Sequence, residues 1–132
     1  MKTDLPKEVE RIGKEVVDSA YKVHHAMGPG LLESIYESCL VKELSKRGLS
    51  FERQKNVTVH CLGEPLDEKL RLDLLVADQV IVEVKSVEAL LPIFDAQLMT
   101  YLKVTGRSLG FLFNFNVRWM KNGIKRVVYT KR

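Results

Sequence analysis

The pattern of hydrophobic positions over the first 48 residues predicts two helices. Apolar residues recur every three or four positions from Val9 to Met27, which predicts an amphipathic helix over residues 7–27. The sequence MGPG at 27–30 ends it, and a second helix starts at once and stops at Gly48. The residues of the second helix expected to face a core are Leu32, Ile35, Cys39, Leu40 and Leu44.

Beyond residue 50 the hydrophobic pattern changes to alternation, which predicts strands. Val57, Val59 and Cys61 indicate one strand, LGEP at 62–65 a turn, and residues 70–76 an antiparallel partner. The apolar sequence VIVEVK at 80–85 indicates a third strand.

The rest of the chain predicts a helix, a buried strand and a terminal hairpin. A third helix is expected between Pro92 and Gly106, followed by the apolar strand LGFLFNF at 109–115. Asn-Gly at 122–123 favours a hairpin that pairs residues 117–121 with 124–128. The order of elements predicts an α/β fold with a mixed sheet flanked by helices, in one domain over residues 1–132.

Composition agrees with a globular protein, and the lack of long apolar segments makes the cytoplasm its expected location. The chain has 132 residues, of which 45% are hydrophobic and 29% charged. We find no apolar run long enough to cross a membrane and no signal peptide at the N-terminus. Cys39 and Cys61 lack CxxC spacing and are expected to be free thiols.

The positive charge is concentrated at the C-terminal end. Residues 106–132 hold seven Lys and Arg and no Asp or Glu, whereas the net charge of the whole chain is +4. A basic hairpin at about 115–132, with Trp119 opposite Arg126, either stabilises itself or forms a platform on which nucleic acid stacks. The other basic residues proposed for this contact are Arg71, Arg107, Arg118, Lys121, Lys125, Lys131 and Arg132.

Two acids are expected to meet between the second and third strands. If Ala77, Asp78 and Gln79 form a three-residue loop, Asp73 lies opposite Glu83, with Cβ atoms about 5 Å apart. A two-residue loop would place them on opposite faces, and the sequence does not decide between the loops. Burying two neighbouring carboxylates requires a proton or a cation.

Two interpretations of this acidic pair remain open. In one, Lys85 and Arg71 neutralise Asp73 and Glu83 in a salt-bridge ladder on a half-exposed sheet face. In the other, both carboxylates and the Val84 carbonyl hold Mg²⁺ or Mn²⁺, which suits oxygen ligands. The chemistry would then be phosphodiester hydrolysis, with Lys85 orienting the nucleophile or stabilising the developing anion.

Three motifs in this sequence carry a resemblance to a known family. RLDLLVADQVIVEVK at 71–85 resembles the D-x(n)-(D/E)-x-K core of the PD-(D/E)XK nuclease superfamily, and QLMTY at 97–101 resembles the Q-x-x-x-Y element of its RecB-type branch. GLLESIY at 30–36 matches G-x-x-E-x-x-Y, the motif of the small bacterial GxxExxY proteins in that superfamily. The resemblance covers about residues 10–115 and implies a restriction-endonuclease-like core.

The resemblance also implies roles for individual residues. Asp73 and Glu83 would bind the metal, Glu33 would assist them, and Lys85 would be the catalytic lysine. Gln97 and Tyr101 would flank the site from the third helix, unless they only pad the sheet edge. Likewise, Glu33 has a structural alternative, because a carboxylate in the first turn of a helix is favoured by the helix dipole. Leu72 stands where the family has a proline that is not a ligand.

The implied activity is that of a Mg²⁺-dependent nuclease acting on DNA more readily than on RNA, and its small size makes a homodimer plausible. Because the superfamily includes inactive relatives, the alternative is a non-catalytic module that binds nucleic acid or protein. A structural subunit of an oligomer has less support.

Overall fold

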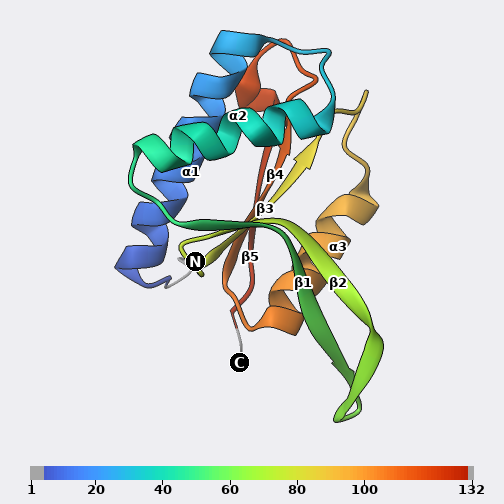
Figure 1. Ribbon diagram of the computed structural model, residues 1–132. Helices are drawn as coiled ribbons and strands as arrows, with labels where there is room; N and C mark the ends of the chain where they lie inside the picture. The colour runs from blue at the N-terminus through green and yellow to red at the C-terminus, as the bar shows by residue number, and fades with distance from the viewer. Residues whose placement is uncertain (1–4, 131–132) are drawn as a thin grey trace.

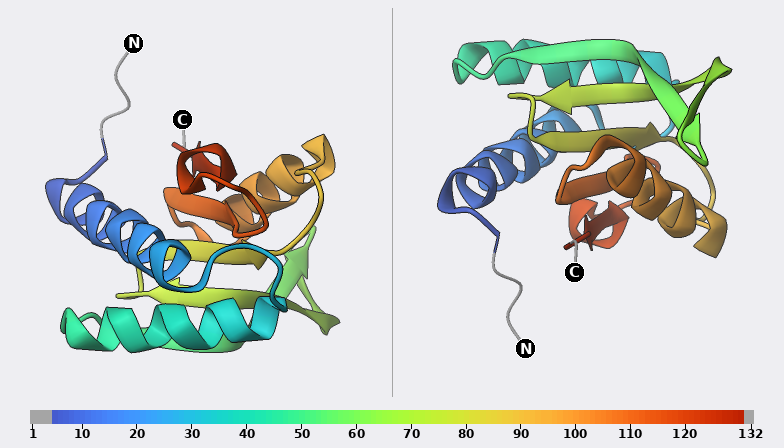
Figure 2. Two further views of the ribbon diagram at one scale, coloured as in Figure 1. Left: turned by 90° about the horizontal axis from the view of Figure 1, so that it is seen from above. Right: turned by 90° about the horizontal axis from the view of Figure 1, so that it is seen from below.

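The fold is a mixed five-stranded sheet with helices on both faces. The computed structural model describes residues 5–130. The strand order is β1-β2-β3-β4-β5, in which β3 and β4 are parallel and the other neighbours are antiparallel. Helices α1 and α2 cover one face of the sheet and α3 the other (Figures 1 and 2). The elements are α1 (Lys7–Met27), α2 (Glu33–Lys46), β1 (Phe51–Cys61), β2 (Glu64–Val76), β3 (Val80–Lys85), α3 (Pro92–Thr105), β4 (Leu109–Asn114), the 3₁₀ helix η1 (Met120–Gly123) and β5 (Ile124–Val128).

The expected α/β class is therefore confirmed, and the helices lie where the hydrophobic period places them. Gly48 and Gly106 follow α2 and α3 with φ of +73° and +70°, conformations that favour glycine. Leu32 and Ile35 were expected to face the core but are 70% and 38% exposed. Helix α2 instead buries Tyr36, Leu40 and Leu44. Ile35 lies beside that stripe, and Leu32 precedes the helix as its N-cap, with an extended backbone. No helix in the described residues is long and apolar enough to cross a membrane.

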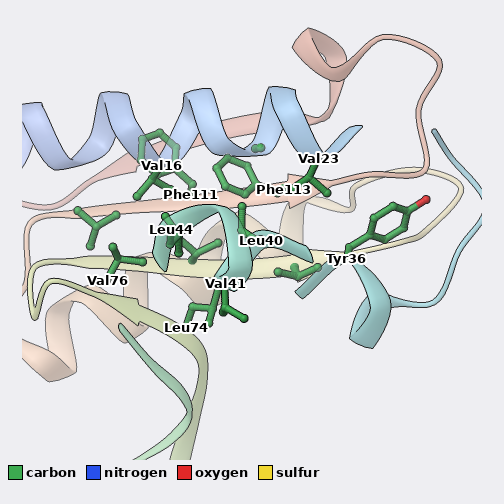
Figure 3. Close-up of a cluster of buried hydrophobic side chains, with 14 of the residues drawn as sticks. Val16, Val23, Tyr36, Leu40, Val41, Leu44, Leu74, Val76, Phe111 and Phe113 are labelled. Carbon is green, nitrogen blue, oxygen red and sulfur yellow. The ribbon is translucent and has the colours of Figure 1, made fainter. Parts of the chain in front are cut away.

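The main hydrophobic core lies between the sheet and the pair α1 and α2. Figure 3 shows Val16 and Val23 of α1 facing Phe111 and Phe113 of β4, with Leu40 and other residues of α2 completing the cluster. Strands β3 and β4 are buried on both sides. In β3, Val80, Val82 and Val84 pack toward α1 and α2, whereas Ile81 packs toward α3. By the same alternation, Glu83 and Lys85 face the side of the sheet that carries α3.

The hairpin of β1 and β2 is longer than the sequence predicts. Strand β1 begins at Phe51 rather than near Val57, and β2 begins at Glu64, directly after a turn at Leu62 and Gly63. Its outer part extends beyond the rest of the molecule (Figure 1), and residues 60–69 are all exposed. The residues of β2 that the pattern misses, 64–69, have no buried face to impose alternation, whereas the residues of β1 that it misses, 51–56, are the inner ones and are polar apart from Phe51.

The predicted C-terminal hairpin is wrong. Residues 120–123 form η1, and β5 pairs antiparallel with β4, Leu109 opposite Val128 and Phe113 opposite Ile124. Buried β4 would otherwise present unpaired backbone groups along one edge, so pairing with β5 satisfies more hydrogen bonds than a local hairpin would. Arg126 is thus opposite Phe111, not Trp119.

Gly123 is required by this arrangement, because η1 packs tightly against the end of β4. A Cβ at this position would overlap the carbonyl oxygen of Asn114 and lie 3.0 Å from Val117 Cγ2. We expect Gly123→Ala to lower the free energy of unfolding by about 3 kcal/mol, since neither backbone can move freely. Urea denaturation followed by circular dichroism measures this change. Asn122→Ala, at an exposed neighbour, should change it by less than about 0.5 kcal/mol, and equal effects of the two variants would contradict the packing described.

Candidate metal and active site

The register of β2 against β3 places Asp73 opposite Glu83. The turn between them consists of Ala77, Asp78 and Gln79, and Leu74 pairs with Val82 and Val76 with Val80. If this register is continued by one position, Asp73 lies opposite Glu83. The three-residue loop is therefore the observed one, and the two acids lie at the same point of the sheet.

At the acidic pair, Asp73 and Glu83, carboxylate oxygens replace main-chain acceptors. The backbone pairing of β2 with β3 ends at Leu74 and Val82. Beyond it, the Asp73 N–H donates to Glu83 Oε2 at 3.0 Å, and the Val84 N–H donates to Asp73 Oδ2 at 2.8 Å. The two strands diverge here, and β2 continues into the exposed hairpin (Figure 1). Each acid is thus held by the backbone of the opposite strand, with one carboxylate oxygen committed to that contact.

The charge of this pair is not neutralised by a salt bridge. No Lys or Arg nitrogen in the described residues lies within 4.0 Å of either carboxylate. Glu83 is 7% exposed, and burial together with the charge of Asp73 raises its pKa to about 8. Burial also raises the pKa of Asp73, against the effect of its hydrogen bond from Val84. The salt-bridge ladder with Lys85 and Arg71 is therefore not present.

Lys85 and helix α3 form one wall of the site, on the face of the sheet that carries α3. The Lys85 ammonium lies 4.4 Å from the centre of the Phe94 ring, and its charge lowers the pKa of both acids. Burial and the nearby acids, Glu83 more than Asp73, raise the pKa of Tyr101, while a hydrogen bond with Gln97 acts in the opposite direction. Tyr101 is half-buried and Gln97 exposed. The structure thus brings Lys85 and Tyr101 to the acidic pair, with Gln97 beside Tyr101.

Glu33 approaches from the other side, at the start of α2. Its Oε2 accepts a hydrogen bond from the Ser86 N–H at 3.0 Å, and the Ser86 hydroxyl donates to the Leu31 carbonyl at 2.6 Å. These contacts tie the loop before α2 to the residue that follows Lys85. The negative charge of Glu33 contributes to the raised pKa of Asp73, which places it in the same acidic environment.

Glu37 also belongs to this environment, and sequence reasoning did not assign it to the site. It lies one turn after Glu33 on α2 and is 6% exposed. Its carboxylate accepts hydrogen bonds from Arg53 Nε at 2.9 Å and Gln54 Nε2 at 2.8 Å. Gln54 has a φ of +48° and stands in β1 between residues that pair with Leu74 and Leu72, beside Asp73. The four-residue spacing from Glu33 was the only available signal, because it places both acids on one helix face.

We expect Glu37→Ala to destabilise the strand that supports Asp73. The change removes the acceptor of two hydrogen bonds, one from a charged donor, and should lower the free energy of unfolding by about 2 kcal/mol. Chemical denaturation measures it. Glu52→Ala is the control, because Glu52 makes an exposed ion pair with Lys55 at 3.2 Å, and such pairs contribute less than about 1 kcal/mol. An effect no larger than that of the control would show that Glu37 does not anchor β1.

Three of the basic residues proposed to bind nucleic acid are engaged in ion pairs. Arg107 donates to the Asp78 carboxylate at 2.6 Å, beside the turn at the opposite end of β3 from Lys85. Lys125 pairs with Asp95 at 3.3 Å and Arg126 with Glu10 at 3.1 Å. Arg71 is exposed on the β2 segment beyond the acidic pair. Lys131 and Arg132 lie outside the described residues. Arg118, Lys121 and the aromatic Trp119 complete the set proposed to bind nucleic acid.

The donor atoms at the acidic pair fit a hard divalent cation. Asp73 and Glu83 each retain a second carboxylate oxygen, and their raised pKa values show that positive charge would stabilise the ionised pair. No group of three or more His, Cys, Asp and Glu side chains in residues 5–130 is arranged to hold a metal ion. Two carboxylates with water in the other positions suit Mg²⁺ or Mn²⁺ better than Zn²⁺.

Comparison with known proteins identifies the family of this chain. The family model of the PD-(D/E)XK nuclease superfamily matches residues 10–127, which include every element from α1 to β5 almost completely. No curated protein and no solved structure gives a significant match. The matched region contains the acidic pair, Lys85 and the mixed sheet that holds them. The chain belongs to the PD-(D/E)XK nuclease superfamily.

Proposed function

We propose that this protein is a metal-dependent nuclease that hydrolyses phosphodiester bonds at the acidic pair. One observation carries the proposal: Asp73 and Glu83 are held together by backbone N–H groups while no cationic side chain lies within 4.0 Å of them in the described residues. An arrangement that raises the pKa of both acids is costly to the fold. It is explained if the pair serves to bind a cation.

Each residue has a distinct role in this proposal. Asp73, Glu83 and the Val84 carbonyl would hold Mg²⁺ or Mn²⁺, with Glu33 assisting. When bound, such an ion lowers the pKa of water and neutralises charge on a phosphate. Lys85, held against Phe94, orients the nucleophilic water or stabilises negative charge that develops on the phosphate.

Gln97 and Tyr101 are proposed to position the phosphate from α3. The Tyr101 phenol, like an ordinary tyrosine, is protonated at neutral pH and can donate a hydrogen bond to a phosphate oxygen; its raised pKa keeps it so at higher pH. Gln97, one turn before it and exposed, offers an amide donor on the same side.

We further propose that the protein is a RecB-type member of the GxxExxY group, acts in the cytoplasm, prefers DNA to RNA and forms a homodimer. The assignment to the RecB-type branch rests on QLMTY at 97–101, and that to the GxxExxY group on GLLESIY at 30–36. The dimer rests on size, since a chain of 132 residues presents limited surface to a duplex. Light scattering of the purified chain tests the dimer, and parallel reactions on DNA and RNA test the preference.

The function is tested by incubating the full chain with plasmid, single-stranded DNA and RNA in Mg²⁺ or Mn²⁺. Cleavage that stops on addition of a chelator is the expected result. Salt-sensitive binding without cleavage of any substrate would favour the non-catalytic module instead. Calorimetry with Mn²⁺ supplies an independent readout, because a chain that binds no divalent ion cannot work as proposed.

A further inference from the structure

A cavity of about 590 Å³ lies between the end of α1 and η1, apart from the acidic pair. This volume falls within the range of about 300–1,000 Å³ that is usual for small-ligand sites. Figures 1 and 2 show the end of α1 and the segment around η1 close together at one end of the molecule. The side chains that define its character are Tyr21, His25, Pro29, Arg118, Trp119 and Lys121.

This cavity is positively charged and aromatic. None of its lining residues is Asp or Glu. Arg118 and Lys121 have no carboxylate within 4.0 Å among the described residues, whereas Arg107, Lys125 and Arg126 of the same segment are ion-paired. The unpaired cations of residues 106–130 therefore gather at the cavity.

Trp119 is exposed although the backbone on both sides of it is anchored. The side chain is 56% exposed and the Arg118 guanidinium lies 5.1 Å from its ring centre. On one side, the Val117 carbonyl is bonded to His24 Nε2 at 2.7 Å, and on the other Met120 is 4% exposed in the main core. The fold thus holds a large aromatic ring and a guanidinium outward on a rigid segment, while Tyr21, 42% exposed, offers a second ring from α1.

A short, anchored loop joins the cavity to the acidic pair. Gly28 lies in the cavity wall, and the backbone from Gly28 to Glu33 spans at most about 18 Å. Tyr36 fixes this loop through its hydroxyl, which donates to the Gly28 carbonyl at 2.5 Å and accepts from the Leu31 N–H at 3.1 Å. A strand of a few nucleotides covers such a distance, because successive phosphates on one strand are at least about 3.4 Å apart.

We propose that this cavity binds one unpaired nucleotide of the substrate strand, a few nucleotides from the bond that is cleaved. The base stacks on Trp119, and Arg118 and Lys121 contact the neighbouring phosphates. Because bases in a duplex are already stacked on each other, only a single-stranded segment fills the site. This inference rests on the proposed function and names its substrate: nucleic acid with a single-stranded region.

Binding without turnover tests the inference, using the full chain in the presence of a chelator. Trp119 is the only tryptophan, so its fluorescence reports occupation of the cavity directly. We expect an oligothymidylate of about ten nucleotides to quench it, and a blunt duplex of equal length to leave it unchanged. Anisotropy of a labelled oligonucleotide then gives the dissociation constant of each variant.

Trp119→Ala should raise that dissociation constant about tenfold, and Trp119→Phe, which keeps a ring, should raise it much less. Lys121→Ala should reduce the slope of log affinity against log salt by about 0.7. Lys46→Ala, which removes an exposed charge at the end of α2, should leave both quantities unchanged.

Three results would overturn the inference: equal quenching by the duplex, an unchanged dissociation constant in Trp119→Ala, or saturation by thymidine monophosphate at lower concentration than by the oligonucleotide. The last would assign the cavity to a free nucleotide. If the protein cleaves but Trp119→Ala has an unchanged dissociation constant for the oligonucleotide, the nucleotide site is wrong and the proposed nuclease activity stands. If the oligonucleotide quenches Trp119 but no substrate is cleaved, the nucleotide site stands and the nuclease activity is wrong.

Discussion

Replacing Lys85 with alanine is expected to lower the rate of phosphodiester cleavage by about a thousandfold and to leave binding of the metal ion intact. Lys85 lies on the same face as Glu83 and is held against Phe94, but its nitrogen is not within 4.0 Å of either carboxylate. Its ammonium is therefore available to water or phosphate at the site. Removing a positive charge near Asp73 and Glu83 should, if anything, strengthen the attraction of these acids for a cation.

Asp73→Asn separates the role of the acids from that of Lys85. Asparagine retains an oxygen that can accept the hydrogen bond from the Val84 N–H, so the local backbone should persist. The variant should lose both metal binding, measured by calorimetry, and cleavage. Lys103→Ala, at an exposed lysine on α3, is the control for Lys85→Ala, because it makes the same change in net charge. If Lys85→Ala cleaves as fast as the unmodified protein, or is slow only because it no longer binds metal, the role assigned to Lys85 is wrong.

The acidic pair could be predicted because it depends on local rules. The length of the loop sets the register of β2 against β3. Once a three-residue loop is assumed, that register brings Asp73 opposite Glu83. The length of this loop was harder to predict. Ala77 and Asp78 both adopt positive φ, +50° and +58°, which is uncommon for residues other than glycine. A pattern of residue types does not reveal that choice.

The parts that failed depend on contacts between distant segments. Asn122 and Gly123 do lie in a turn, but the strand that follows it, β5, pairs with the open edge of buried β4 and not with residues 117–121. Glu37 looked like an ordinary polar residue of a helix, because its importance arises from Arg53 and Gln54, which the fold brings to it. One interpretation of the basic C-terminal segment gathered its residues on a nucleic-acid platform, whereas Lys125 and Arg126 form ion pairs with acids from α3 and α1.

The raised pKa of Glu83 predicts that the metal-free protein loses stability as the pH rises from about 5 to about 8. In the unfolded chain Glu83 ionises near its ordinary pKa of 4.5, whereas in the folded chain it keeps its proton up to about pH 8. Between these values the unfolded state binds fewer protons than the folded state, so the free energy of unfolding falls with pH, by at most about 1.4 kcal/mol per pH unit. Above pH 8 both states are ionised and this contribution no longer changes.

Glu83→Gln should abolish most of that dependence. Glutamine can still accept the hydrogen bond from the Asp73 N–H, but it has no charge to bury. In chelator, the variant should match the unmodified protein near pH 5 and exceed its free energy of unfolding by a few kcal/mol at pH 8.5. Urea denaturation followed by circular dichroism at several pH values measures both. Glu88→Gln, at an exposed acid, serves as the control.

Mg²⁺ extends this test to the function of the pair. Because the cation competes with the proton on Glu83, the ion should stabilise the unmodified protein more at pH 8.5 than at pH 5.5, and should stabilise Glu83→Gln little at either. Parallel pH profiles for Glu83→Gln and the unmodified protein would mean that Glu83 is ionised in the fold at neutral pH. The acidic pair would then already be compensated by the protein itself, and the physical reason for it to capture a metal ion would disappear.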